Sequence, residues 1–291
     1  MLNKYLAVGT VQFGLDYGAV NNEGQVSLDD AREILDFARD SGMDTLDTAA
    51  VYGNSEERLG ELNVSDWQIV SKLPKIPSDC TDVTDWVNTT VKTTLSRIRV
   101  PKLYGLLLHY PHQLFEKNGD ELYGALSKLV SDGVIDKIGV SIYSPDELDS
   151  VLEKFRFNLV QAPFNPFDQR LVISGWIKKL KEKNIELHVR SIFLQGILVT
   201  EPNKLPSQFT NWKPMLNRWH KWLDENKITP VEACLRHALG RSEVSRVIVG
   251  INNINQLKDI LDNISDKFID IPSEFQCSDL NIIEPSRWNK S

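Results

Sequence analysis

Four side chains in the first half of the chain are of types that together could move a proton onto an oxygen. They are Asp47, Tyr52, Lys72 and His109. A free tyrosine has a pKa near 10, and a nearby lysine cation would lower that pKa by stabilising the phenolate. An aspartate could hold the charge of the lysine, and a histidine could orient a carbonyl oxygen. The set predicts protonation of an oxygen while a hydride, most naturally from a nicotinamide, attacks the adjacent carbon.

Each residue alone also has an ordinary structural interpretation. Lys72 could be a solvated charge at the end of a strand, and His109 a satisfied structural residue after three leucines. Asp47 could cap the following turn. The functional interpretation depends on all four converging, so the elements that carry them must be identified.

Short apolar runs recur along the chain, with amphipathic segments of helical spacing between them. The runs are YLAVGT, MDTLDT, WQIVSKL, LYGLLLH, KIGVSI, LVQAPF, ELHVRSI and RVIVGI. Such runs, rich in Val, Ile and Leu, are typical of buried parallel strands. Eight strands alternating with helices predict a (β/α)8 TIM barrel, formed by residues 1–291 as a single domain. A doubly wound sheet is the alternative, but its glycine fingerprint does not match GTVQFG after the first run.

The helical segments carry recognisable start and stop signals. In SLDDAREILDFARDSG, Ser27 and Asp30 resemble a capping box and Gly42 is a stop signal. The other segments are VTDWVNTTVKTTLSRI, DELYGALSKLVSDG, SPDELDSVLEKF and VISGWIKKLKEKN. The longest irregular stretch runs from about Gly196 to Pro214, and a loop of that length is more often functional than idle.

In a barrel the active site lies at the carboxyl ends of the strands. Asp47 ends the second run, Lys72 lies at the end of the third and His109 ends the fourth. Ser141 ends the fifth run and Gln161 lies at the start of the sixth. The barrel therefore predicts that these side chains meet at one rim.

Composition excludes several classes of function. The net charge of −7 argues against nucleic-acid binding, and no apolar stretch is long enough to span a membrane. The three cysteines are far apart, which indicates a reducing compartment and neither a disulfide framework nor a metal site. The N-terminus lacks an apolar signal region, so we expect a cytoplasmic protein. A monomer is the default expectation.

The sequence resembles the aldo-keto reductase superfamily over nearly its whole length. The most specific stretches are LDTAAVYGNSEERLG, VSKL, LLLHYP, GVIDKIGVS, LVQAPFNPFD and SIFLQGIL. The resemblance implies a (β/α)8 barrel that reduces aldehydes and ketones with NADPH or, less often, NADH. It implies that Tyr52 is the general acid, that Lys72 and Asp47 tune it, and that His109 positions the carbonyl.

The resemblance also implies a set of cofactor contacts, with three departures from the family pattern. NADP(H) is the expected cofactor and NAD(H) a competitor. Ile142 stands where an asparagine usually follows Ser141, Arg190 replaces an aromatic residue, and Lys258 is off the spacing of the usual 2′-phosphate ligand. The expected cofactor-binding residues are Gly9, Thr10, Val11, Asp47, Ser141, Gln161, Arg190, Ser191, Phe193, Gly196, Gly250, Asn252 and Gln256.

The expected substrate is a small-molecule carbonyl compound, including sugar aldehydes. The residues expected to line its pocket are Phe13, Tyr52, His109, Tyr110 and Trp212. The alternative for Trp212, Trp219 and Trp222 is a helix face that packs on the barrel. The C-terminal segment is short for the family, which predicts an open pocket with weak selectivity.

Two other functions remain open at this stage. A cofactor-binding regulator on the same barrel would explain why the usual contacts to the carboxamide and the 2′-phosphate are missing. Such a protein has no need for a tyrosine whose pKa is shifted by a lysine and an aspartate. An isomerase or aldolase would use Lys72 as a Schiff-base nucleophile, but Asp47 would keep that lysine protonated.

Overall fold

The computed structural model describes residues 2–288, which form a closed barrel of eight parallel strands. Each strand pairs with the next and β8 returns to β1, with Val8 beside Leu46 and Leu6 beside Val247. The predicted (β/α)8 barrel is confirmed. The strands are β1 Leu6–Gly9, β2 Thr45–Asp47, β3 Gln68–Leu73, β4 Leu103–Leu108, β5 Ile135–Ser141, β6 Leu159–Pro163, β7 Glu186–Arg190 and β8 Arg246–Gly250.

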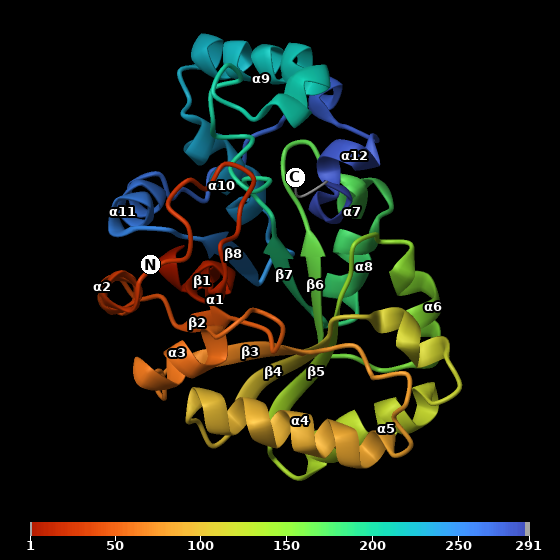
Figure 1. The fold of residues 1–291 in the computed structure, drawn as a ribbon. Helices are drawn as coiled ribbons and strands as arrows, with labels where there is room; N and C mark the ends of the chain where they lie inside the picture. Colours follow the sequence, from red (N-terminus) through yellow and green to blue (C-terminus); the bar gives the residue numbers. More distant parts are fainter. Residues whose placement is uncertain (1, 289–291) are drawn as a thin grey trace.

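Helices surround the barrel, with α4 and α5 outside β4 and β5, and α9 beyond the strands at the top of the view (Figure 1). The α-helices are α1 Val11–Gly14, α2 Leu28–Asp40, α3 Ser55–Glu61, α4 Val83–Ile98, α5 Gly119–Ser131, α6 Glu147–Lys154, α7 Arg170–Ile173, α8 Trp176–Glu182, α9 Lys213–Asn226, α10 Pro230–Leu239, α11 Ile254–Asp262 and α12 Leu280–Ile283. The 3₁₀ helices are η1 Leu2–Tyr5, η2 Pro111–Phe115, η3 Ser207–Trp212, η4 Ser273–Phe275 and η5 Pro285–Arg287.

Local sequence explains where the helices begin and where one of them breaks. Ser27 caps α2 by accepting the Asp30 N–H at 3.1 Å, as predicted. The single helix predicted over residues 172–184 is wrong, because Gly175 adopts φ +76° and separates α7 from α8. Left-handed backbone of this kind cannot continue a right-handed helix.

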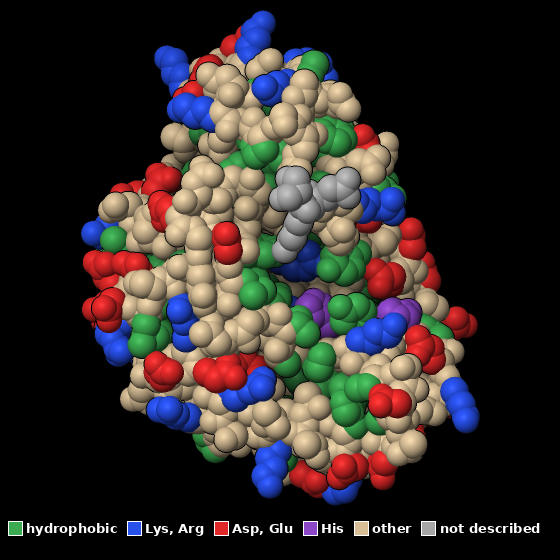
Figure 2. All heavy atoms as spheres, viewed as in Figure 1, with side chains coloured by type: hydrophobic (Ala, Val, Ile, Leu, Met, Phe, Trp, Pro, Cys, Tyr) green, Lys and Arg blue, Asp and Glu red, His purple; other side chains and the backbone are tan. Residues whose placement is uncertain are grey.

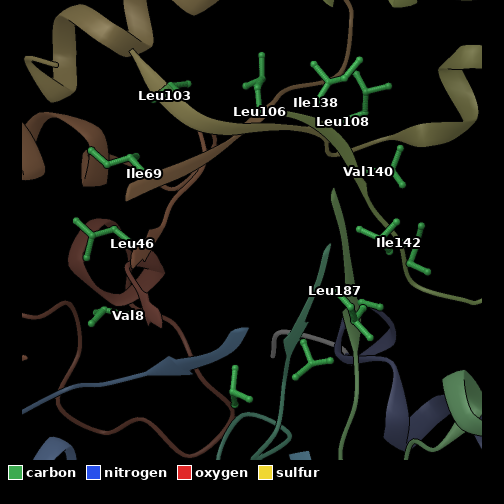
Figure 3. Close-up of a cluster of buried hydrophobic side chains, with 14 of the residues drawn as sticks. Val8, Leu46, Ile69, Leu103, Leu106, Leu108, Ile138, Val140, Ile142 and Leu187 are labelled. Carbon is green, nitrogen blue, oxygen red and sulfur yellow. The ribbon is translucent and has the colours of Figure 1, made fainter. Parts of the chain in front are cut away.

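The main core lies between the outer face of the strands and the helices. Leu46, Ile69, Leu106, Ile138 and Val140 point outward from successive strands and are buried (Figure 3). Each such side chain stabilises the fold by about 1.5–3 kcal/mol, before entropy is counted.

The inner face of the barrel changes from apolar to polar toward the carboxyl ends. Val70, Leu107 and Leu159 form a small buried cluster within the barrel. Because alternate residues share a face of a strand, Lys72 and Gln161 come next to Val70 and Leu159 on that inner face. Inside the barrel, the polar side chains therefore lie next to this apolar cluster, on the side of the carboxyl ends of the strands.

A second core lies beside the barrel and is built from the segment after β7, α9 and the C-terminal region. Trp219 is fully buried there, 5.5 Å from the Trp222 ring at an interplanar angle of 20°. The long irregular stretch predicted at 196–214 therefore belongs to a packed unit, and its later part forms η3 and the start of α9. Trp219 and Trp222 pack from α9 into this core, in line with the helix-face alternative, whereas Trp212 lies at the end of η3, before α9.

Within residues 2–288, no helix is long and apolar enough to cross a membrane.

Candidate active site

Asp47 and Lys72 form a buried ion pair inside the barrel. Lys72 Nζ donates to Asp47 Oδ1 and Oδ2 at 2.8 and 2.7 Å, and to the Thr48 carbonyl at 2.9 Å. The side chains are 1% and 7% exposed. All three ammonium donors are thus used, which is the arrangement that makes a buried charge tolerable.

Tyr52 lies in the turn between β2 and α3, over the ion pair. The Lys72 ammonium is 5.0 Å from the centre of its ring, and the His109 ring lies edge-on at 6.3 Å. Glycines allow this turn to approach α1 closely, since a Cβ on Gly14 would lie 1.7 Å from the Tyr52 carbonyl oxygen. The four residues predicted from three strand ends are therefore neighbours.

The pKa of Tyr52 is raised, in contrast to the expected lowering by Lys72. Burial is the main cause and the Asp47 carboxylate adds to it, while the Arg190 cation opposes the rise. The expectation fails because the Lys72 donors face Asp47 and Thr48 and its charge is neutralised there. Tyr52 consequently holds its proton at neutral pH.

The other two titratable groups are shifted by the same burial. Burial lowers the pKa of Lys72, and the Asp47 carboxylate opposes that change. Burial, with the Lys72 and Arg190 charges, lowers the pKa of His109 to about 4, so its ring is neutral at pH 7. Its Nδ1 is buried and makes no hydrogen bond with residues 2–288. A neutral imidazole has one N–H donor to offer a ligand.

Ser141 and Gln161 lie side by side on β5 and β6 and extend the polar floor. Ser141 Oγ donates to Gln161 Oε1 at 3.2 Å, and Gln161 Nε2 donates to Asp47 Oδ1 at 2.6 Å. Ile142 is fully buried in the main core. Gln161 is thus fixed in orientation by Asp47, and the apolar side chain of Ile142 offers no polar contact.

A cavity of about 540 Å³ opens at the carboxyl ends of the strands and runs from Tyr52 and His109 to α11. Every residue expected to bind the cofactor lines it, and so do both predicted catalytic residues with exposed polar groups, Tyr52 and His109. On this face of the molecule, hydrophobic and histidine side chains gather near the centre, together with a Lys or Arg side chain, and most other charged side chains lie toward the edges (Figure 2). Lys72 does not line the cavity itself, but it contacts Asp47 and the ring of Tyr52, which do.

Three residues expected in the substrate pocket do not line this cavity. Phe13 is fully buried in the main core, because α1 turns its side chain inward. Trp212 packs against the second core and donates its indole N–H to Asp279 Oδ2 at 2.9 Å. Tyr110 is 38% exposed beside His109, at 5.4 Å between ring centres.

Sequence comparisons agree with this geometry. The model of the Aldo/keto reductase family matches residues 5–271. The chain belongs to this family.

Individual members of the family are distant relatives. The chain is 25% identical over 249 residues to the uncharacterized oxidoreductase YqkF of Bacillus subtilis (strain 168), covering 79% of this chain and 80% of that protein. It is 29% identical to the glyoxal reductase of the same organism, over 64% of this chain and 65% of that protein. An aldo-keto reductase from Bacillus halodurans, solved in its holo form, superposes with a TM-score of 0.76 at 19% identity, covering 98% and 95% of the two chains.

Membership makes the protein an oxidoreductase of a family whose general reaction is carbonyl reduction with nicotinamide cofactors. Against the family pattern, Arg190 stands out because it is a cation in the cavity wall. Its Nη2 donates to the Ile142 carbonyl at 3.0 Å, and its guanidinium lies 4.9 Å from the centre of the Tyr143 ring. Arg190 takes part in none of the ion pairs formed among residues 2–288.

Several lining residues were missed by the sequence reasoning, chiefly in the loop between β1 and α2. Tyr17 and Asn21 line the cavity, and the Gln195 amide donates to the Tyr17 hydroxyl at 2.8 Å. The Asn252 amide donates to Asn21 Oδ1 at 3.3 Å. The loop thus crosses over the cavity and touches both the segment after β7 and the start of α11. The contacts that fix this path join residues far apart in the chain, so the local sequence gives no sign of it.

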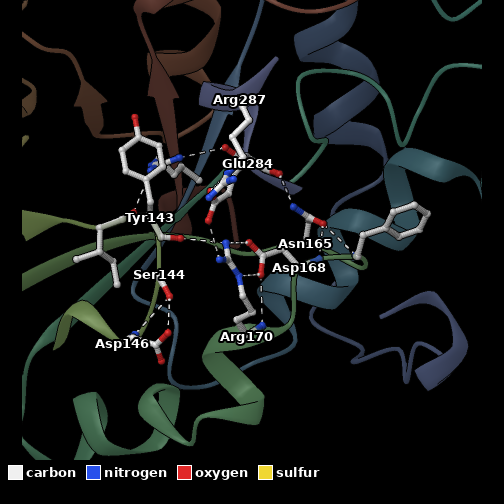
Figure 4. A network of polar contacts seen from close by, with 12 residues as sticks. Tyr143, Ser144, Asp146, Asn165, Asp168, Arg170, Glu284 and Arg287 are labelled. Atoms are coloured by element: carbon white, nitrogen blue, oxygen red, sulfur yellow. Dashed lines mark hydrogen bonds and ion pairs between the residues drawn. The ribbon is translucent and has the colours of Figure 1, made fainter. Parts of the chain in front are cut away.

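Tyr143 was also missed, and a polar network holds its backbone in place (Figure 4). Arg170 Nη2 donates to the Tyr143 carbonyl at 3.0 Å, while the same guanidinium pairs with Asp168 and Glu284 at 2.8 and 2.9 Å. The C-terminal segment is therefore linked to the wall of the cavity through one arginine.

Proposed function

We propose that the protein reduces the carbonyl group of a small aldehyde or ketone, with Tyr52 as the proton donor and a nicotinamide dinucleotide as the hydride source. The observation that carries this proposal is the meeting of Asp47, Tyr52, Lys72 and His109 at one end of an elongated cavity. Family membership supports the reaction class, and the geometry supports the residue roles.

The residues of the cavity fit a nicotinamide dinucleotide. Gln12 Oε1 and Asn252 Oδ1 are buried acceptors in its wall that have no partner among residues 2–288, as expected where a polar ligand binds. Gly250 leaves room there, since a Cβ on it would lie 2.5 Å from the Gln12 amide. Ser141 and Gln161 would hold the nicotinamide end, and Ser191, Phe193 and Gly196 the centre. When bound, the cofactor supplies a hydride to the carbonyl carbon.

The residues at the reacting end act on the carbonyl oxygen. The neutral His109 ring donates a hydrogen bond that orients this oxygen, and Tyr52 transfers its proton as negative charge develops. The raised pKa of Tyr52 is compatible with this role, because an alkoxide is a stronger base than a phenolate. The Asp47–Lys72 pair fixes the floor beneath Tyr52 and makes no direct hydrogen bond to its hydroxyl.

The size of the cavity favours small carbonyl compounds, because a dinucleotide would fill most of it. The relative named glyoxal reductase supports a small substrate, and a sugar-type aldehyde fits the same polar reacting end. Tyr110 lies on the exposed side of His109 and is our candidate contact for such a substrate.

A second candidate is a cofactor-binding regulator with slow or no turnover. The raised pKa of Tyr52 favours it, because proton donors work best with a pKa near the operating pH. The buried Ile142, which replaces a polar contact, favours it too.

Nicotinamide fluorescence on titration, followed by cofactor consumption with a panel of small aldehydes and ketones, separates the two candidates. The reductase predicts binding and turnover, with turnover lost in Tyr52→Phe and kept in Tyr5→Phe, an exposed tyrosine away from the cavity. Binding without turnover on every carbonyl would favour the regulator.

A further inference from the structure

The far end of the cavity, at α11, bears on which dinucleotide the protein selects. Under the proposed function, the nicotinamide must lie beside Tyr52 and His109, where the hydride is used. The cavity then continues to Gln256, Asp259 and Ile260 on α11. The adenosine half of an extended dinucleotide therefore falls at this end, and the inference below depends on that placement.

One carboxylate lines this end of the cavity, and a second, the exposed Glu23, lies beside the start of α11 without lining the cavity. Asp259 lines the cavity directly. Glu23, on the loop between β1 and α2, accepts the Asn253 side-chain amide at 3.2 and 3.1 Å through its two oxygens. Asn253 in turn caps α11 by accepting the Gln256 N–H at 3.1 Å. Glu23 is thus tied to the first turn of α11, next to the unpartnered acceptor Asn252 Oδ1.

Neither carboxylate forms an ion pair with a Lys or Arg among residues 2–288. Arg190 is the single Lys or Arg in the described wall of the cavity, and it stacks on Tyr143 near the reacting end. Lys258 lies on α11 but does not line the cavity, and its ammonium sits 5.6 Å from the centre of the Phe37 ring on α2. The adenosine end is therefore acidic and lacks the charge-assisted donors that bind a phosphate tightly.

We propose that the protein selects NAD(H) over NADP(H), and that Glu23 is the main residue that sets this selectivity. A 2′-phosphate would bring about two negative charges close to Glu23 and Asp259, and like charges repel. A 2′-hydroxyl can instead donate a hydrogen bond to a carboxylate, which is how dinucleotide sites commonly recognise NAD. Discrimination arises from repulsion of the wrong ligand as much as from attraction of the right one.

This inference reverses the expectation that NADP(H) is the main cofactor. The sequence indicated only that a basic residue for the 2′-phosphate is missing at the usual spacing. The added observation is Glu23, which lies 230 residues before Asn253 in the chain and meets it only in the folded barrel.

The test compares the dissociation constants of NADH and NADPH, which are measured by nicotinamide fluorescence with the full chain. We expect NADH to bind at least about tenfold more tightly, as one or two partly screened charge repulsions imply. Glu23→Gln should tighten NADPH binding about tenfold with little effect on NADH, and Glu23→Arg should reverse the preference. Raising the salt concentration should narrow the wild-type difference, since exposed charges are screened.

The matched control is Glu153→Gln, which makes the same charge change at an exposed residue on α6, whereas Glu23 is bound to Asn253 at the start of α11. It should leave both constants unchanged. NADPH binding as tight as NADH binding, or a ratio that Glu23→Gln does not move, would overturn the selectivity while leaving the proposed function intact. Failure of both dinucleotides to bind would overturn the proposed function and the selectivity with it.

Discussion

At the scale of single residues, the ion pair of Asp47 and Lys72 is the part of the site where we expect a single substitution to cost the most stability. Both side chains are buried, and breaking such a pair leaves one charge uncompensated in a low dielectric. Removing both charges is far less costly than removing one. Each charge of the pair is therefore needed for the stability of the fold as long as its partner is present.

We expect Lys72→Met to lower the free energy of unfolding by about 3–5 kcal/mol, because Asp47 is left buried without its cation. The double variant Lys72→Met with Asp47→Leu should recover much of this loss. Urea unfolding of the wild type, the two single variants and the double variant measures the coupling. A cost below about 1 kcal/mol for Lys72→Met would contradict the account of the ion pair.

At the scale of elements, close backbone packing of α1 against the turn before α3 places Tyr52. The approach depends on two glycines without side chains. Gly53 adopts φ +55°, and a Cβ on it would lie 2.2 Å from the Gly14 carbonyl oxygen. Backbone atoms on both sides leave no flexible group that could give way.

Gly14→Ala should therefore displace the Tyr52 turn, since its Cβ would lie 1.7 Å from the Tyr52 carbonyl oxygen. We expect turnover to fall by about a hundredfold, as misplacement of a catalytic group by 1 Å can cost that much. Gly124→Ala is the control, because a Cβ there meets nothing within 4 Å and lies on the exposed face of α5. Turnover in Gly14→Ala close to that of Gly124→Ala would contradict this role of the glycine.

An element can be predicted from the sequence when the residues that determine it lie within the element itself. It is not predictable when it depends on contacts with residues far away in the chain. The strands and the capping of α2 follow from side-chain patterns within each segment, and the structure bears them out. The break at Gly175 depends on a left-handed residue within an otherwise helical pattern. The packing of the segment after β7 depends on contacts with the distant C-terminal region, such as that of Trp219 with Phe275.

The candidate site also has features that the sequence predicts and features that it does not. The barrel topology is enough to bring Asp47, Tyr52, Lys72 and His109 together, because carboxyl ends of parallel strands share one rim. The direction of the Tyr52 pKa shift was not predictable, since it depends on where the Lys72 donors point.

At the scale of the whole molecule, buried histidines make the fold sensitive to acid. His237 is fully buried in the main body of the protein, stacked on Phe164 at 4.6 Å, and neither ring nitrogen has a partner among residues 2–288. Burial lowers its pKa to about 3, and the Arg241 cation adds to this effect. Between that value and the ordinary value near 6.5, the unfolded chain binds more protons than the folded one.

The free energy of unfolding should therefore be greatest above pH 6.5 and fall as the pH falls toward 3. His237→Phe removes this group, so the loss of stability between pH 7 and pH 5 should shrink by about 2 kcal/mol. Urea unfolding at the two pH values measures it, with His112→Gln at an exposed histidine as the control. An equal loss in wild type and His237→Phe would contradict the assignment.

Under the proposed function, Tyr52 donates the proton during carbonyl reduction. The most direct measurement is the rate of a single turnover with preloaded reduced cofactor and a reactive small aldehyde, for wild type and Tyr52→Phe. We predict a rate at least about a hundredfold lower in Tyr52→Phe, as loss of a general acid implies, with an unchanged dissociation constant for the cofactor. A single-turnover rate that survives the loss of the hydroxyl would contradict the assignment of Tyr52.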